Sequence, residues 1–157
     1  MRGFTLIEVV VSISIVSLVV VGVMFVFSLN LTSASRSINN LIAANLAQEG
    51  LEIVRNIRDK DWHLGNPFGT SLPNGTYLAD WNSQNLISFS DIPLKKDSTG
   101  IYNYTSGQDT NFKRKIIIED SLQNPPTIEK VVKVEISWQE RGGLKTIQAE
   151  LRLFNWR

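Results

Sequence analysis

A long uncharged apolar run near the N-terminus constrains this chain more than any other feature. The segment from Val9 to Leu29 contains no charged side chain and is dominated by Val, Ile, Leu and Phe. At a rise of 1.5 Å per residue, such a helix spans roughly 32 Å, about the hydrocarbon core of one bilayer. The remainder is polar and of mixed charge, so the sequence predicts one membrane anchor followed by one soluble head.

The composition excludes several kinds of site. There is no cysteine among the 157 residues, so disulfides, thiolate metal sites and thiol nucleophiles are ruled out. The single histidine, His63, cannot build a multi-histidine metal site. The 16 basic and 15 acidic residues nearly cancel and give no argument for a nucleic-acid partner. No nucleophile elbow or phosphate-binding glycine loop appears, and we predict no catalytic activity, metal or cofactor.

The residues in front of the apolar run are more specific than its length. A secretory signal peptide would have an apolar region of roughly 7–15 residues and more basic charge than the single Arg2. A plain signal-anchor helix explains the length but not the order GFTLIE from Gly3 to Glu8. That order resembles the type IV prepilin family, whose leader ends in Gly and whose mature chain begins with Phe-Thr-Leu-Ile-Glu.

The resemblance implies roles for three residues. It implies cleavage between Gly3 and Phe4 by a prepilin peptidase on the cytoplasmic side, followed by N-methylation of the new Phe4 amine. Glycine at position 3 suits a narrow protease subsite because it has no side chain. Glu8 has two explanations: it reaches the interface at the cytoplasmic edge, or it pairs with the Phe4 ammonium of a neighbouring subunit. The surrounding motif favours the pairing, which would set insertion and axial register in a filament.

One continuous helix is expected from about Phe4 to about Arg58, roughly 80 Å long. No proline precedes Pro67, and Gly22 stands alone in the apolar half, where many major pilins carry a proline. The first half is apolar all round, which predicts burial in lipid or among other helices. The second half has one apolar stripe that should lie on the head. Its members are Ile38, Ile42, Leu46, Gly50, Ile53, Val54 and Ile57.

The head is predicted to end in an antiparallel sheet. Turn residues fill 65–75, and 77–81, 86–89 and 101–104 are candidates for short strands. Three later segments are clearer strands: 112–119, and the alternating runs 132–139 and 147–153. Gly142 and Gly143 suit a tight hairpin between the last two. A three-stranded meander laid across the amphipathic half of the helix follows, an α+β, pilin-like fold.

The expected divisions are a leader at 1–3, a membrane-spanning and filament-core helix at 4–30, and its amphipathic continuation at 31–59. The head occupies 60–157, with a loop region at 60–110 and the β-meander at 111–157. Two segments, 45–52 and 112–116, resemble bacterial minor pilins of the filament tip or initiation complex.

Other candidate sites have simpler explanations. The loop carboxylates fit no calcium-loop spacing and should be solvated. These are Asp91, Asp97, Asp109 and Asp120. The basic run 113–115 should be split across the two faces of a strand rather than form a nucleic-acid patch. Among the tryptophans, Trp138 and Trp156 are expected to be packed, while Trp62 and Trp81 are the better candidates for an exposed contact.

The sequence therefore predicts a minor pilin of a type IV pilus. A pseudopilin of a type II secretion system fits the same residues, and a single-pass membrane-anchored binding or sensor domain is the hypothesis from another class. Expected partners are other pilin subunits, the prepilin peptidase and methyltransferase, the inner-membrane assembly platform, and lipid before assembly. The expected location is the cytoplasmic membrane with the head outside, then the extracellular pilus or periplasmic pseudopilus.

Overall fold

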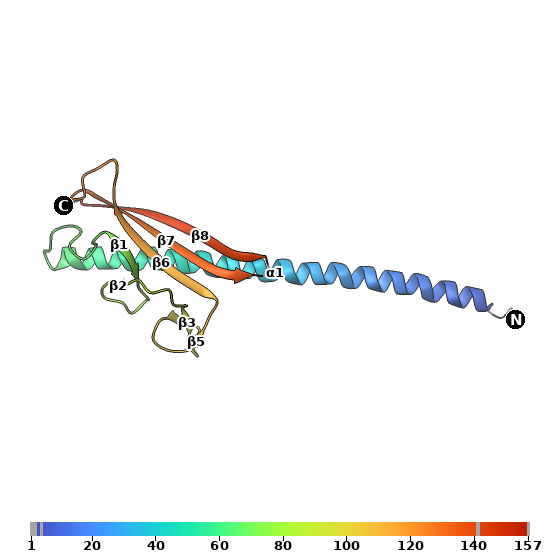
Figure 1. The fold of residues 1–157 in the computed structure, drawn as a ribbon. Coiled ribbons are helices and arrows are strands. Elements are labelled where there is room, and N and C mark those ends of the chain that lie inside the picture. Colours follow the sequence, from blue (N-terminus) through green and yellow to red (C-terminus); the bar gives the residue numbers. More distant parts are fainter. Residues whose placement is uncertain (1–2, 4, 141, 157) are drawn as a thin grey trace. The chain divides into compact units, whose positions relative to one another are not determined.

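The computed structural model describes residue 3, residues 5–140 and residues 142–156. Within this part of the chain, one long helix, α1 (Leu6–His63), precedes all the strands (Figure 1). The chain divides into two compact units, Met1–Leu41 and Ile42–Arg157, which are described separately below. The helix thus runs from the first unit into the second.

The first unit is helical, its residues from Leu6 to Leu31 are mainly apolar, and its large apolar side chains are exposed. Leu18 is 74% exposed and Phe25 is 65% exposed, and the large apolar side chains between them are exposed as well. Ile38, which the sequence pattern assigned to the core stripe, is also exposed in this unit. That assignment was wrong: the buried stripe of α1 begins only at Ala43.

The end of α1 lies beyond the expected Arg58 because buried residues continue past it. Asp61 and Trp62 are buried, and Asp61 accepts hydrogen bonds from Asn66 Nδ2 at 3.1 Å and from Ser71 N at 2.9 Å. Gly65 then adopts a φ of 76°, in the left-handed region that commonly ends a helix. Burial alone would raise the pKa of Asp61, but the hydrogen bonds from the following loop outweigh it and hold that pKa below its usual value.

The second unit contains a five-stranded antiparallel sheet in the order β2-β1-β6-β7-β8. Three long strands dominate it: β6 (Phe112–Asp120), β7 (Glu129–Glu140) and β8 (Gly143–Phe154). Glu140 pairs with Gly143, as the predicted hairpin requires. The expected α+β fold, with a long helix and an antiparallel meander, is confirmed, and two short strands extend the sheet.

The region 60–110 holds short strands. Those of the main sheet are β1 (Gly75–Leu78) and β2 (Ile87–Ser88). A second sheet, in the order β4-β3-β5, is formed by β3 (Lys95–Lys96), β4 (Tyr102–Asn103) and β5 (Gln108–Asp109). The sequence pattern did not predict β3 and β5, because pairs of polar residues show no alternation to detect.

The core of the second unit forms between the α1 stripe and one face of the sheet. Alternate residues of β7 are buried, as predicted, and they belong to one cluster with Leu46, Ala47 and Val54 of α1. Gly50 allows the closest approach, because a Cβ there would lie 2.8 Å from Val134 Cγ1. The members of the cluster from β6 and β7 are Phe112, Ile116, Ile118, Val132, Val134, Ile136 and Trp138.

Candidate functional site

The first turn of α1 contains a reciprocal cap between Thr5 and Glu8. Glu8 Oε2 accepts hydrogen bonds from Thr5 N and from Thr5 Oγ1, both at 2.9 Å. Thr5 Oγ1 in turn accepts the Glu8 N–H at 3.4 Å. This is a capping box, in which Ser or Thr at the N-cap and Glu three residues later satisfy each other's backbone donors. The cap therefore holds the Glu8 carboxylate at the positive end of the helix dipole.

Sequence reasoning singled out Glu8 and missed its partner. The T-x-x-E spacing of Thr5 and Glu8 in front of an apolar run was the available signal.

The predicted cleavage site flanks this cap. Gly3 is exposed, and a Cβ added there would meet no atom within 4 Å. The described residues thus leave room for a side chain at position 3. Phe4, the predicted methylation site, lies outside the described residues, as do Met1 and Arg2 of the leader.

The helix that follows is long and apolar enough to cross a membrane. Its most apolar window has a mean hydropathy of 2.9, and none of that window is buried within the structure. The core helix of a soluble protein would be covered by its own fold, and this segment is not. These side chains therefore require an apolar environment, either lipid or other apolar helices.

In the second unit, an ion pair with a buried arginine joins residues 45–52 of α1 to residues 112–116 of β6. Arg114 of β6 is 1% exposed, and its Nη2 lies 3.2 Å from Glu49 Oε2 on α1. Arg114 Nη1 also donates to the carbonyl of Ala79 at 2.9 Å. The predicted split of the basic run is observed, since Arg114 points inward while Lys113 and Lys115 form ion pairs on the other face with Asp91 and Glu135.

The surroundings of this pair are strongly desolvated. Tyr104 lies nearby, and burial raises its pKa to about 12; the carboxylates of Asp80 and Glu49 add to the rise, and Arg114 opposes it. Within the described residues, Arg114 Nε and Nη2 and Glu49 Oε1 have no hydrogen-bond partner, so the 3.2 Å contact of Arg114 Nη2 with Glu49 Oε2 is an ion pair and not a hydrogen bond. The guanidinium therefore depends on the charge of Glu49 and on one carbonyl, and removal of Glu49 would leave a buried charge poorly compensated.

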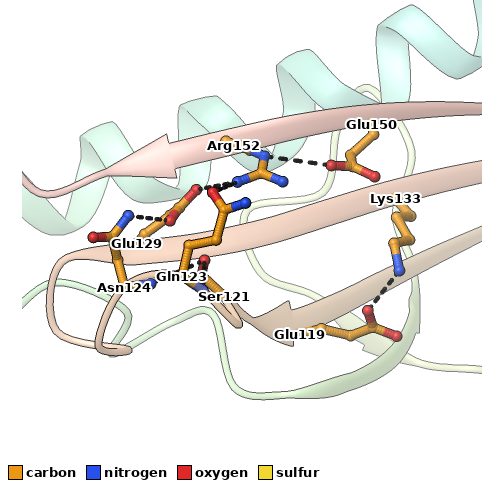
Figure 2. A network of polar contacts seen from close by, with 8 residues as sticks. All are labelled: Glu119, Ser121, Gln123, Asn124, Glu129, Lys133, Glu150 and Arg152. Carbon is orange, nitrogen blue, oxygen red and sulfur yellow. Dashed lines mark hydrogen bonds and ion pairs between the residues drawn. The ribbon is translucent and has the colours of Figure 1, made fainter.

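A second polar network ties the loop after β6 to the last strand (Figure 2). Glu129 is fully buried, and it accepts hydrogen bonds from Asn124 Nδ2 at 2.6 Å and from Arg152 Nη1 at 3.2 Å. Hydrogen bonds from Ser121 and Asn124, together with the charge of Arg152, hold the pKa of Glu129 below its usual value. Arg152 also lies 3.5 Å from Glu150. The network stabilises the loop.

The loop carboxylates are engaged locally. Asp97 caps its own turn through Thr99 and Ile101, and Asp120 pairs with Lys130 and accepts a hydrogen bond from Asn74 at 2.7 Å. Across the residues that the structure describes, no group of three or more His, Asp or Glu side chains could hold a metal ion.

The tryptophans are arranged differently from the sequence-based expectation. Trp138 is buried and Trp81 is 56% exposed, as predicted. Trp62 and Trp156 are exchanged: Trp62 is 8% exposed, while Trp156 is 70% exposed and lies edge-on to Trp62 with 4.1 Å between ring centroids. The expectation failed because α1 continues past Arg58 and carries Trp62 on its buried stripe.

Comparison with known proteins identifies the N-terminal segment. Residues 1–24 match the family described as the prokaryotic N-terminal methylation motif. A search of curated proteins and a search of solved structures each found no match. The match covers the leader, the capped first turn and most of the exposed apolar run.

Proposed function

We propose that this chain, which carries the type IV prepilin signature at residues 1–24, is a minor pilin that joins or primes a type IV pilus. In this proposal the leader is removed between Gly3 and Phe4, the Phe4 amine is methylated, and the subunit is assembled through α1. The chain acts as a structural subunit and as the substrate of its processing enzymes, not as a catalyst.

The observation that carries the proposal is the uncovered apolar surface of the first unit. Burying one Val, Leu, Ile or Phe side chain stabilises a protein by roughly 1.5–3 kcal/mol, and this unit leaves a continuous series of them exposed. Such a surface is stable in a bilayer before assembly and among sibling helices afterwards. A filament subunit held in the inner membrane by this helix uses both environments.

Glu8 is the residue that we assign to register. Its carboxylate would pair with the Phe4 ammonium of a neighbouring subunit once the leader is gone. A carboxylate has about four lone-pair sites, so the bonds from Thr5 and a neighbour's ammonium can be accepted together. In an apolar helix bundle an unpaired Glu8 would be costly, which would favour the one axial position that supplies a partner.

The head supports the minor-pilin assignment through the Glu49–Arg114 pair. The two segments that resemble minor pilins, 45–52 and 112–116, supply the two charges of this pair. The residues that carry the resemblance thus include the two that connect α1 to β6 by an ion pair. The inferred partners are other pilins, the prepilin peptidase and methyltransferase, and the assembly platform of the inner membrane.

Two matched variants test the role of Glu8. Glu8→Ala removes the cap and the carboxylate, whereas Thr5→Ala removes most of the cap and keeps the carboxylate. Both variants lose part of the capping box. We expect both to be processed, Thr5→Ala to enter filaments, and Glu8→Ala to stay in the membrane fraction. Normal incorporation of Glu8→Ala into sheared filaments would refute the pairing.

Crosslinking tests the filament type. Photo-crosslinkers in the exposed half of α1, followed by mass spectrometry of the adducts, identify the neighbouring subunits. Adducts with pilins of a surface pilus support the proposal, and adducts only with components of a type II secretion machine would replace it with the pseudopilin alternative.

A further inference from the structure

A hollow of about 270 Å³ in the second unit lies between α1 and the turn formed by residues 81–84. Its apolar base is formed by Ile53 and Ile57, which are 6% and 3% exposed. Asn56 and Lys60 lie one helical turn apart on the same side of α1 and line one wall. The hollow is slightly smaller than the roughly 300 Å³ of the smallest drug-sized pockets, so it suits a ligand about as large as one sugar ring.

Trp81 is the most unusual residue of this hollow. Its side chain is 56% exposed, whereas Trp138 and Trp62 are almost completely buried. Trp62 and Trp138 each contact a second aromatic ring, and among the described residues Trp81 contacts none. An exposed indole beside a hollow provides a flat apolar surface without a packing role of its own.

The turn that presents Trp81 is held in one conformation by buried Asp80. Asp80 Oδ1 accepts hydrogen bonds from Ser83 Oγ at 2.8 Å and from Asn82 N at 3.2 Å. Asp80 Oδ2 accepts the Tyr104 N–H at 3.1 Å, and the Ser83 N–H donates to the Asp80 carbonyl at 2.9 Å. Because the turn is already ordered, ligand binding would not lose affinity to the entropy cost of ordering it.

The polar groups around the hollow are mainly neutral amides. Asn56, Asn82 and Gln84 each offer an N–H₂ donor and a carbonyl acceptor. Lys60 Nζ donates to Gln84 Oε1 at 3.3 Å, which links the two walls. Among the described residues, no carboxylate lines the hollow, as a cation site would require, and one lysine is too little for a phosphate site.

A pyranose ring matches this chemistry. Its hydroxyl groups act as donors and acceptors at once, which amide side chains satisfy, and its C–H face is apolar and packs on an aromatic ring. We propose that the hollow binds one pyranose unit of a polysaccharide, with the sugar stacked on Trp81 and its hydroxyls bound by Asn56, Asn82 and Gln84. The minor pilin would then carry a saccharide-binding site on its head.

Binding is measured with the full chain in detergent micelles. Four trisaccharides serve as probes: maltotriose, cellotriose, chitotriose and trigalacturonate. Isothermal titration and tryptophan fluorescence should detect binding of at least one at millimolar concentration. Trp81→Ala should weaken that affinity at least about ten-fold, as expected for a central aromatic anchor. Asn56→Ala should weaken it by a smaller factor.

The matched control is Trp156→Ala, which removes another exposed indole outside the hollow. It should leave the affinity unchanged, and thermal unfolding should show that Trp81→Ala is folded. No binding of any probe by the wild type, or equal loss in both tryptophan variants, overturns the inference. Preferential binding of trigalacturonate identifies an acidic sugar as the ligand. Filament incorporation is a separate measurement, so a subunit that assembles and binds no saccharide contradicts this site alone.

Discussion

The two parts of α1 have the same backbone conformation and opposite surroundings. From Leu6 to Leu41 the large apolar side chains are exposed, whereas from Ala43 to Trp62 one stripe is buried under the strands of its own head. From Leu6 to Leu31 apolar residues surround the helix, and in the second part they recur at helical spacing between polar ones. The distribution of apolar residues around a helix thus distinguishes a segment that the chain covers itself from one that needs an external partner.

The two parts should also respond differently to substitution. A change in the second part alters the free energy of unfolding of the head, because the side chains there have fixed neighbours. A change in the first part should alter processing or assembly and leave the head intact. All four tryptophans lie in the second unit, so tryptophan fluorescence reports unfolding of the head alone.

The largest expected effect is on processing. Gly3→Val should abolish leader cleavage, because a branched side chain would not fit a peptidase subsite suited to glycine. The chain itself has space at this position, so the fold should be unchanged. Electrophoretic mobility and N-terminal sequencing give the outcome, and fluorescence-detected unfolding gives the control. Cleavage at the wild-type rate would show that Gly3 is not a recognition element.

Loss of the buried ion pair is the next largest effect. Arg114→Ala should destabilise the head by about 2–5 kcal/mol, because it removes a buried side chain and leaves a cavity between α1 and β6. Urea unfolding followed by tryptophan fluorescence measures it. The exposed pair Glu52–Arg55 is the control, and Arg55→Ala should cost less than about 1 kcal/mol. Equal effects of the two variants would contradict the assigned role of Arg114.

Two glycines of α1 offer a matched comparison of its parts. Gly50→Ala should destabilise the head by about 1–3 kcal/mol, because the added Cβ would lie 2.8 Å from Val134 Cγ1 and 3.4 Å from Arg114 Cδ. Gly22→Ala meets no atom within 4 Å and should leave unfolding of the head unchanged, while favouring the local helix by about 1 kcal/mol. A neutral Gly50→Ala would show that helix and sheet are packed less closely than described.

The smallest expected effect is a pH dependence from Glu129. Its pKa in the folded head lies below the unfolded value of about 4.3, so it stabilises the fold above that pH. This contribution is lost as the pH falls through the folded-state pKa. Unfolding midpoints measured between about pH 6 and pH 3 should fall less steeply for Glu129→Gln than for the wild type. An identical acid dependence would mean that Glu129 does not titrate in this range.

Much of this architecture was predictable because it depends on periodicity. The alternation of Val132, Val134, Ile136 and Trp138 fixed the buried face of β7, and the position of Gly142 and Gly143 indicated the hairpin. The GFTLIE order was recognised differently, by its resemblance to the type IV prepilin motif, and the family match over residues 1–24 agrees with it. These features depend on residues that are neighbours in the sequence, so they can be recognised from one sequence.

The rest depends on contacts between distant residues. Nothing in the sequence pairs Glu49 with Arg114, or brings Asn56 and Lys60 to the same hollow as Trp81. The end of α1 was misplaced because a loop residue, Ser71, holds Asp61 in the helix. Such contacts form only when the chain is folded, so they can be identified only from the structure.

We propose above all that a short leader is cleaved from α1 and that the exposed half of the helix then packs against the helices of other pilin subunits. Intact-mass and N-terminal peptide analysis of the protein purified from its own cells tests this most directly. The account predicts a chain that begins at Phe4 with a methylated amine. A chain that retains Met1 and an unmodified N-terminus would contradict it.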